Sequence, residues 1–352
     1  MKKVFESYNL GGISMQNRLV RSATFETGGA ENGVIMPLLK EIYQDLARGQ
    51  VGLIITGMMG IGPNANLGPG MVRIHDESFV PAFSAISQSV HELGGKIVVQ
   101  LGHCGAKSMV VDWGEHPFCP SDYKNAKEIS RDEMNMLVKH YGAAAARCKE
   151  AGADGVQIHG AHGYLVSQFL SPHFNQRTDE YGGDIQNRAR FLFEIYDEIR
   201  ASVGAEYPIF IKLNYSDLVE NSMTAQECAW VCVELEKRGL DAIEVSSGVS
   251  VSRESSSVQS GPQIEEGFFA AGGLDIAEKV SIPVISVGGY RTVETIEAKL
   301  NEGKLAAISL CRPFICEPSL AARWAAGEQA KSACVSCSKC FAMPQHGCIL
   351  QQ

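Results

Sequence analysis

Short apolar runs rich in valine and isoleucine recur along the chain, and helix-like segments fill the intervals between them. The runs occupy residues 18–22, 51–56, 96–101, 155–159, 209–213, 242–246, 283–287 and 306–310. Because they do not alternate between apolar and polar residues, they indicate parallel strands that are covered on both faces. The intervening segments include residues 134–152 and 187–204, which have helical periodicity and end in glycine. About eight strand–helix units of this kind predict a TIM (β/α)8 barrel.

A doubly wound sheet is the main structural alternative. That fold would place a glycine fingerprint after its first strand, but the glycine-containing segment 57–68 lacks both the spacing and the following helix. The composition changes only near residue 331, where a cysteine-rich stretch begins. We therefore predict one barrel domain, residues 1–330, and a short cysteine-rich C-terminal tail, residues 331–352.

The composition argues against several classes of partner. The 352 residues are 45% hydrophobic and carry a formal net charge of −9, which disfavours nucleic acid or an anionic membrane as the main partner. The start of the chain has no apolar run of a signal peptide, and no stretch approaches the roughly 18 apolar residues of a membrane span. Eleven cysteines without an export signal indicate reduced thiols or a metal site. We expect a cytoplasmic protein that acts on a small molecule, and a homo-oligomer is compatible with the sequence.

Polar residues gather at the carboxyl ends of the predicted strands, where TIM barrels carry their chemistry. They are Ser22, Ala23 and Thr24 after the first strand, Gln100 and His103 at the third, His159 at the fourth, Lys212 in the fifth, Gly288 and Gly289 after the seventh, and Cys311 and Arg312 after the eighth. The glycines and the arginine suit a phosphate group. Lys212 lies in an apolar run, so it needs an anionic partner or a catalytic task. A structural ion pair is the alternative.

The segment HGAHGY places His159, His162 and Tyr164 where a predicted strand gives way to a loop. A zinc site would need a third protein ligand and an activating acid, and the segment supplies neither. Two histidines buried in the core are a further alternative. Two imidazole donors beside a phenol suit a carbonyl oxygen that must become an enolate, with the tyrosine supplying a proton to the neighbouring carbon.

The segment HGAHGYLVSQFLSPHFNQRTDEYGGDIQNRARF (159–191) is the longest of a specific set of motifs. Shorter members lie at residues 17–24, 51–56, 100–107, 211–217 and 311–318. Together they strongly resemble the flavin-binding ene-reductases of the Old Yellow Enzyme family, over essentially all of residues 1–330. The resemblance implies a TIM barrel that holds FMN non-covalently at its strand ends. It also implies that NADH or NADPH reduces the flavin and that hydride then passes to an activated alkene.

The resemblance assigns roles to individual residues. The flavin-binding set comprises Ser22, Ala23 and Thr24 along one flavin edge, Gly57 where the backbone approaches the ring, Gln100 at the pyrimidine, Lys212 beside the N1/C2 carbonyl region, and Gly289, Cys311 and Arg312 at the phosphate. In this interpretation the reduced flavin is the anionic partner that Lys212 requires. His159 and His162 match the pair that binds the electron-withdrawing group of the substrate, and Tyr164 matches the proton donor.

The chain departs from the family pattern at Phe25. This residue follows Thr24 where many relatives place a hydroxyl, a thiol or another polar group near the flavin C4 carbonyl. A phenyl ring cannot donate a hydrogen bond, so we expect an unusual flavin potential or substrate preference unless Thr24 substitutes as the donor.

The tail contains Cys334, Cys337, Cys340 and Cys348 in the pattern C-x2-C-x2-C-x7-C, which is typical of iron–sulfur or zinc sites. Longer relatives similar to dienoyl-CoA reductase and trimethylamine dehydrogenase have a comparable cluster that binds [4Fe–4S] and relays electrons from a downstream flavin domain. Here the final gap is shorter than theirs, and the sequence ends without such a domain. Iron–sulfur, zinc and an unloaded relic therefore remain three interpretations of the tail.

These patterns together predict an FMN-dependent NAD(P)H oxidoreductase that transfers hydride to the C=C bond of an α,β-unsaturated carbonyl compound. An iron–sulfur flavoenzyme of the dienoyl-CoA reductase or amine dehydrogenase type is the first alternative. A flavin barrel that modifies RNA is disfavoured by the acidic charge and by HGAHGY, and a flavin-binding protein without a physiological enoate substrate is the remaining alternative.

Overall fold

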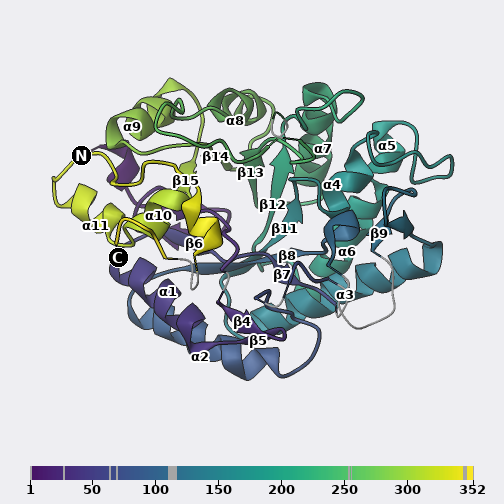
Figure 1. Ribbon diagram of the computed structural model, residues 1–352, viewed down its shortest axis with the longest axis horizontal. Helices are drawn as coiled ribbons and strands as arrows, with labels where there is room; N and C mark the ends of the chain where they lie inside the picture. Colours follow the sequence, from purple (N-terminus) through teal and green to yellow (C-terminus); the bar gives the residue numbers. More distant parts are fainter. Residues whose placement is uncertain are drawn as a thin grey trace.

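The computed structural model describes residues 2–26, 28–62, 65–68, 70–109, 117–252, 254, 256–343 and 347–351. Within these residues, eight parallel strands close into a barrel (Figure 1). They are β3 (Leu19–Arg21), β6 (Leu53–Ile55), β8 (Ile97–Gly102), β11 (Gly155–Gly160), β12 (Ile209–Asn214), β13 (Ala242–Ser246), β14 (Val284–Val287) and β15 (Ala307–Leu310). Neighbouring strands pair in this order, and β15 pairs with β3 to close the barrel. Each strand falls on one of the predicted runs, so the TIM barrel is confirmed.

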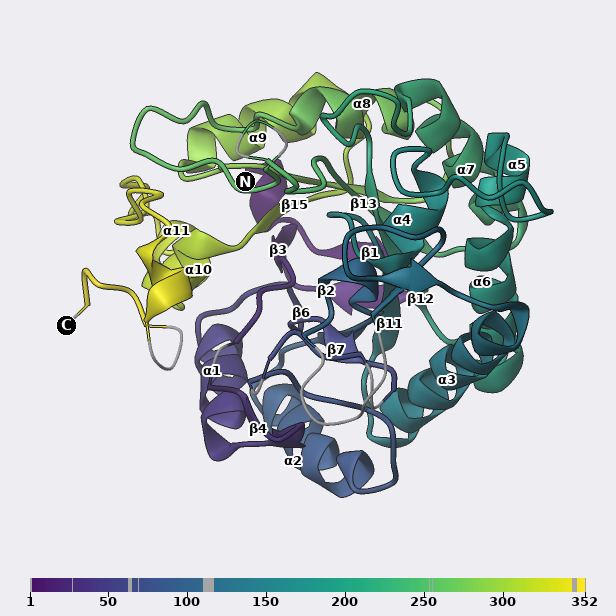
Figure 2. The ribbon, with the colours of Figure 1, turned by 45° about the vertical axis from the view of Figure 1, so that its right-hand side comes forward.

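Helices surround the barrel and connect its strands, as the ring of ribbons in Figure 2 shows. The longer ones are α1 (Pro37–Arg48), α2 (Phe79–Glu92), α3 (Arg131–Glu150), α6 (Arg190–Val203), α7 (Ala225–Lys237), α8 (Ala270–Ala277) and α9 (Val293–Glu302). Shorter helices are α4 (Leu165–Leu170), α5 (Ile185–Arg188), α10 (Arg312–Cys316) and α11 (Leu320–Ala325). The helix expected over 134–152 begins earlier because Ser130 and Glu133 form a capping box. The helix expected over 187–204 is divided between α5 and α6.

Small elements complete the chain. They are the pairs β4 (Ala30–Glu31) with β5 (Val34–Ile35) and β9 (Phe118–Cys119) with β10 (Lys127–Glu128), the strand β7 (Met59–Gly60), and the 3-10 turns η1 (Lys3–Phe5), η2 (Gly105–Lys107) and η3 (Lys339–Ala342). No helix among the described residues is long and apolar enough to cross a membrane.

An N-terminal hairpin closes one end of the barrel. Its strands β1 (Tyr8–Leu10) and β2 (Ile13–Met15) pair antiparallel, and their buried side chains pack against inward-facing residues such as Phe210. At the turn, Gly11 has φ +52°, and a Cβ there would lie 2.5 Å from the carbonyl oxygen of Asp241. Only glycine fits so close to the strand, and this contact seats the hairpin on the barrel.

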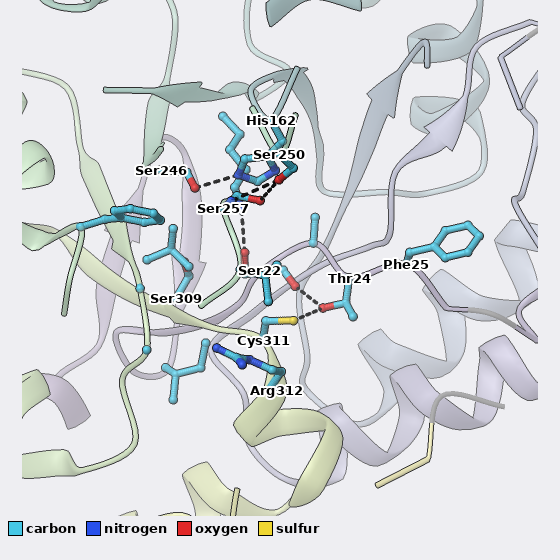
Figure 3. Close-up of a pocket in the computed structure, with 18 of the residues that line it drawn as sticks. Ser22, Thr24, Phe25, His162, Ser246, Ser250, Ser257, Ser309, Cys311 and Arg312 are labelled. Atoms are coloured by element: carbon cyan, nitrogen blue, oxygen red, sulfur yellow. Dashed lines mark hydrogen bonds between the residues drawn. The ribbon is translucent and has the colours of Figure 1, made fainter. Parts of the chain in front are cut away.

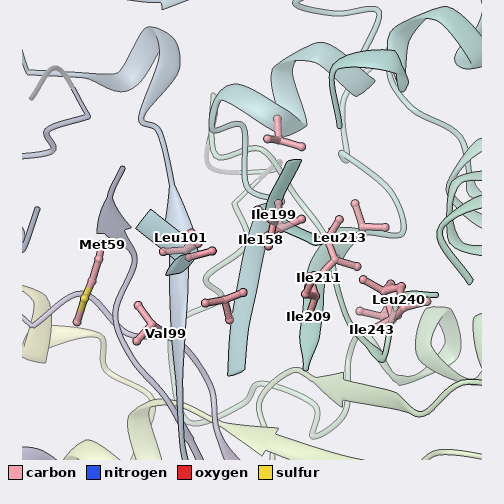
Figure 4. Close-up of a cluster of buried hydrophobic side chains, with 14 of the residues drawn as sticks. Met59, Val99, Leu101, Ile158, Ile199, Ile209, Ile211, Leu213, Leu240 and Ile243 are labelled. Atoms are coloured by element: carbon pink, nitrogen blue, oxygen red, sulfur yellow. The ribbon is translucent and has the colours of Figure 1, made fainter. Parts of the chain in front are cut away.

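The main hydrophobic core lies between the strands and the surrounding helices. Figure 4 shows side chains such as Leu101, Ile158, Ile211 and Leu213, together with Ile199 of α6. All are buried, and each contributes roughly 1.5–3 kcal/mol by leaving water. Because strand side chains alternate between faces, the positions between these residues point into the barrel.

The inward positions change in character along the barrel axis. On β12 they are Phe210, then Lys212, then Asn214, and on β13 they are Ala242, then Glu244. The barrel interior is therefore apolar beside the hairpin and polar towards the carboxyl ends of the strands. This gradient places charged and hydrogen-bonding groups where a ligand can reach them.

Candidate active site

A cavity of about 320 Å³ lies at the carboxyl ends of the barrel strands (Figure 3). This is the end where TIM barrels carry their chemistry, and the volume falls within the roughly 300–1,000 Å³ typical of small-molecule sites. The cavity brings together nearly every site residue predicted from the sequence. Those that line it are Ser22, Ala23, Thr24, Gln100, His159, His162, Tyr164, Lys212, Gly289, Cys311 and Arg312.

Gly57 is the exception among the predicted flavin-binding residues. It lies outside the lining of this cavity, in a small apolar hollow beside Glu26 and Met58. A Cβ at Gly57 would lie 2.3 Å from Oε2 of Glu26 and 2.4 Å from the carbonyl oxygen of Thr24. The close approach that requires glycine here is therefore to the loop after β3, and the flavin contact expected of Gly57 stays a prediction.

A buried polar network lies beneath the cavity. Lys212 pairs with Glu244 in the sheet register, and its Nζ donates to Glu244 Oε1 at 3.0 Å. The hydroxyls of Ser22 and Ser309 each donate to the same oxygen at 2.7 Å. Gln157 Nε2 donates to the other carboxylate oxygen at 3.0 Å. The carboxylate thus receives several donors in a place that water does not reach, because Glu244 is fully buried.

The charge on Glu244 changes the interpretation of Lys212. Burial raises the pKa of Glu244, but the charge of Lys212 and the hydrogen bonds from the serines outweigh it and hold that pKa below its ordinary value. Lys212 therefore has its anionic partner inside the barrel. The expectation that a flavin must supply this partner is corrected, although Lys212 still lines the cavity. The network also reaches Gln100, whose Nε2 donates to Gln157 Oε1 at 2.7 Å.

The residues of HGAHGY gather at one wall of the cavity. The ring centroid of His159 lies 5.2 Å from that of His162 and 4.8 Å from that of Tyr164. His162 has φ +61°, an uncommon backbone conformation that occurs preferentially at functional sites. Its Nε2 lies 2.8 Å from the Ser246 hydroxyl, as Figure 3 shows. The Nδ1 atom of His159 is buried without a hydrogen-bond partner among the described residues, while the residue itself lines the cavity.

Both histidines are neutral at ordinary pH. Burial lowers the pKa of His159 well below its ordinary value, and the charges of Lys212 and Lys107 act in the same direction. Burial, then His159, then the two lysines lower the pKa of His162 as well. Burial raises the pKa of Tyr164, so its phenol keeps its proton. The wall therefore presents neutral imidazoles and a protonated phenol, which suit the binding of an oxygen and the delivery of a proton.

The opposite side of the cavity is formed by the ends of β14 and β15. Gly288 and Gly289 have φ +139° and +72°, and a Cβ at Gly289 would lie 2.7 Å from the ring of Phe268. Arg312 donates to the carbonyl oxygen of Gln259 at 2.8 Å and to that of Ser336 at 3.1 Å. The predicted phosphate residues are thus adjacent to this end of the cavity, and Arg312 also fastens the C-terminal tail to the barrel.

Thr24 and Phe25 differ in their relation to the cavity. The Thr24 hydroxyl donates to the carbonyl oxygen of Ser22 at 3.0 Å and lies 3.0 Å from the sulfur of Cys311. Both residues line the cavity, and the replacement of the missing polar group at position 25 by Thr24 stays a prediction. Figure 3 shows the Phe25 ring directed away from Cys311, and it packs against the apolar cluster around Met58.

The tail cysteines share one small hollow but do not form a metal site in this structure. Cys334, Cys337, Cys340 and Cys348 all line a cavity beside Arg312. Among the described residues, no three histidine, cysteine, aspartate or glutamate side chains are arranged to hold a metal ion. The iron–sulfur and zinc interpretations therefore remain predictions.

Several residues of the site escaped the sequence analysis. Glu244 and Gln157 lie within predicted strands, and a charged residue inside an apolar run was a usable signal for Glu244, as it was for Lys212. Arg291, which is 3% exposed, and Lys107 both line the cavity. Lys107 falls in the matched segment 100–107, but nothing local reveals that its ammonium group reaches the loop of His162.

Comparison with known proteins defines the class to which this barrel belongs. The sequence profile of the NADH:flavin oxidoreductase / NADH oxidase family matches residues 3–331. The chain belongs to this family, which confirms the resemblance found in its motifs. The solved structure of an Old Yellow Enzyme homologue from Zymomonas mobilis superposes with a TM-score of 0.80 at 26% identity and covers 93% of this chain and 94% of its own.

Two curated relatives illustrate the range of the family. An NADPH dehydrogenase of Clostridium acetobutylicum is 31% identical over 323 residues, which cover 90% of this chain and 92% of the relative. A metal reductase of Desulforamulus reducens is 33% identical over 347 residues, or 96% of this chain but 51% of the relative. The chain therefore spans about half the length of that protein and nearly all of the other.

Proposed function

We propose that this chain is an FMN-dependent NAD(P)H oxidoreductase that reduces the C=C bond of α,β-unsaturated carbonyl compounds. The observation that carries the proposal is the wall formed by His159, His162 and Tyr164, whose neighbouring rings all line the cavity. When bound, FMN accepts hydride from NADH or NADPH and passes it to the alkene.

The cavity contains groups suited to each part of FMN. Gln100 and Lys212 lie beside the polar network, where the pyrimidine part of the flavin needs hydrogen bonds and a positive charge. Gly289 and Arg312 lie at the ends of β14 and β15, the loops that bind phosphate in many TIM barrels. Ser22, Ala23 and Thr24 provide the edge between these two regions.

The chain's own residues would position and protonate the substrate. Neutral His159 and His162 donate hydrogen bonds to the carbonyl oxygen and stabilise the negative charge that develops on it. Tyr164, whose pKa burial raises, retains the proton that it delivers to the α-carbon. The rings of Tyr164 and His159 lie next to each other, with their centroids 4.8 Å apart, so one substrate can contact both.

The proposal is tested first by the cofactor. The purified protein should bind about one FMN, and Arg312→Ala should weaken FMN binding roughly 10- to 100-fold because a charge-assisted hydrogen bond contributes about 1.5–3 kcal/mol. Arg48→Ala, an exposed arginine on α1 outside the cavity lining, is the control. Protein that cannot be reconstituted with FMN would end the proposal, as would FMN-loaded, NADPH-reduced protein that does not transfer hydride to any cyclic enone.

An iron–sulfur flavoenzyme is the second candidate. It is favoured by the four tail cysteines that line one hollow and by the half-length match to a metal reductase. Anaerobic protein should then contain about four irons per chain and absorb broadly near the flavin bands. Protein that binds zinc alone, or neither metal when both are supplied, excludes this candidate.

A further inference from the structure

The charges around the cavity are all of one sign. Among the described lining residues, Lys107, Lys212, Arg291 and Arg312 are cationic, and none is an aspartate or a glutamate. The chain as a whole has 31 lysines and arginines against 40 aspartates and glutamates, so this excess of positive charge is local. A cavity of this kind binds anions.

Three of the four cations already have partners or assigned tasks. Lys212 is paired with Glu244 at 3.0 Å. Arg291 lies 3.9 Å from a carboxylate oxygen of Glu266 and donates to backbone carbonyls, and the proposed function assigns Arg312 to the flavin phosphate.

Lys107 is the remaining cation. Its Nζ donates to the carbonyl oxygens of His162 at 2.6 Å and Val249 at 2.9 Å, and it lies 5.0 Å from the centroid of the Tyr164 ring. An ammonium group has three N–H donors, so one remains available. No carboxylate among the described residues forms an ion pair with Lys107, so its charge is balanced by carbonyl dipoles and by the face of the Tyr164 ring.

We propose that Lys107 binds an anionic group of the substrate, and that the preferred substrates are α,β-unsaturated carbonyl compounds that carry a carboxylate. This inference rests on the proposed function, because it uses the same wall of the cavity. Lys107 is held by the loop of His162 and faces Tyr164, so its free N–H lies beside the groups assigned to the carbonyl oxygen and the α-carbon. A carboxylate on the substrate would accept a hydrogen bond from the third N–H of Lys107 and neutralise its charge.

The environment of Lys107 keeps it cationic near neutral pH and favours the binding of an anion. Burial lowers the pKa of Lys107 to about 8, the Cys104 thiol opposes this effect, and Lys124 adds to it. The neighbouring His162 and Tyr164 are neutral, since the pKa of the histidine is lowered and that of the tyrosine is raised. A bound carboxylate would favour the charged ammonium group and so offset the hydration that burial removes.

The test uses a charged probe, (E)-4-oxopent-2-enoate, and its neutral methyl ester, and their different intrinsic reactivity cancels when wild type and variant are compared. The ratio of kcat/KM for the acid to kcat/KM for the ester is measured in the FMN-loaded wild type and in Lys107→Met. Both values should fall in the variant because Lys107 also holds the His162 loop, but the ratio should fall roughly 10- to 100-fold, as loss of one charge-assisted hydrogen bond requires. Lys124→Met removes the same charge from an exposed neighbour outside the lining and should leave the ratio within about twofold.

A binding measurement separates affinity from catalysis. Titration of the oxidised holoenzyme with 4-oxopentanoate or its methyl ester, followed by flavin absorption, gives a dissociation constant for each saturated analogue. Lys107→Gln keeps N–H donors for the two carbonyls but removes the charge, so it should weaken binding of the acid more than that of the ester. In the wild type, rising ionic strength should weaken the binding of the acid but not that of the ester, and this measurement requires no variant.

Each failure has a distinct meaning. If kcat/KM and binding affinity fall equally for the acid and the ester in both Lys107 variants, Lys107 only positions the His162 loop. The inference about substrate charge is then overturned, while enone reduction stands. If the Lys107 variants instead slow reduction of the flavin by NADPH, the anionic group that Lys107 binds belongs to the nicotinamide dinucleotide. That result also overturns the inference about substrate charge. If the wild type reduces neither probe nor cyclohexenone, the proposed function itself fails.

Discussion

The two ends of the barrel are built from the same strands but differ in the polarity and the packing of their inward side chains. At the hairpin end, Leu10, Phe210 and the other inward side chains are apolar and buried, and the turn at Gly11 closes tightly on the strands. At the carboxyl end, the next inward position on β12 after Phe210 is Lys212, and the space above it is open. One strand thus passes from a packed interior to a reactive cavity within a few residues.

The difference separates stability from chemistry. The hairpin end gains free energy by removing apolar surface from water and leaves no space for a ligand. The open end keeps two features that cost folding free energy, namely the unpaired, buried Nδ1 of His159 and the left-handed backbone of His162. Substitutions at the open end should therefore change activity more than stability, and substitutions at the hairpin end should do the reverse.

The largest expected effect is on chemistry at the open end. Tyr164→Phe keeps the ring but removes the proton, so enone reduction should slow roughly 10²- to 10⁴-fold. The free energy of unfolding should change by less than about 1 kcal/mol, since the ring still packs. Stopped-flow reoxidation and denaturant titration measure the two quantities. Tyr123→Phe, which loses a hydroxyl outside the cavity lining, is the control. A large loss of stability with normal activity would reverse the assignment of the two ends.

The largest effect on stability is expected at the hairpin end. Phe210 is fully buried against the hairpin, and Phe210→Ala should lower the free energy of unfolding by about 3–5 kcal/mol. The fraction of protein that remains folded should bind FMN and reduce enones with near-normal kcat, because Phe210 does not line the cavity. Urea titration of the holoenzyme, combined with activity per bound FMN, tests this. Loss of chemistry without loss of stability would show that the two ends are not separable.

A smaller effect should appear as a pH dependence of stability that arises from a buried histidine after β8, at the open end. Burial, and then the charge of His140, lower the pKa of His103 to about 3. Below pH 6.5 the unfolded chain therefore takes up a proton that the folded protein refuses, so stability falls as the pH drops towards 3. Between pH 7 and 5 this histidine should cost about 2 kcal/mol, and His159 and His162 add in the same direction.

His103→Asn should remove part of this slope. The penalty of Phe210→Ala should stay the same at both pH values, because the hairpin end depends on apolar burial. Denaturant titrations at pH 7 and pH 5 compare the variants. A wild-type stability that rises on acidification would contradict the neutral state of the buried histidines.

The sequence predicted the barrel well because its signals are local and repeated. Eight apolar runs placed every strand of the barrel to within a few residues, and HGAHGY stood out because three side chains that line the cavity lie within six residues. The motifs also predicted that residues as distant as Ser22 and Arg312 meet at one cavity, since parallel strands end on the same face.

The sequence could not reveal contacts that depend on register or on loop geometry. Lys212 was recognised as needing an anion, but its pairing with Glu244 follows from the alignment of β12 with β13. Lys107 reaches the carbonyls of His162 and Val249 across loops that are far apart in the chain. No motif indicated that Glu26 packs tightly against Gly57.

The central claim is that His159 and His162 hold the carbonyl oxygen while charge develops on it. The direct measurement is stopped-flow analysis of both half-reactions in FMN-loaded His159→Ala and His162→Ala. Alkene-dependent reoxidation should slow roughly 10²- to 10³-fold, the usual loss of one oxyanion donor. Reduction by NADPH should suffer less, because no enolate forms in that step. Reoxidation of both variants by cyclohexenone at wild-type rates would contradict the claim.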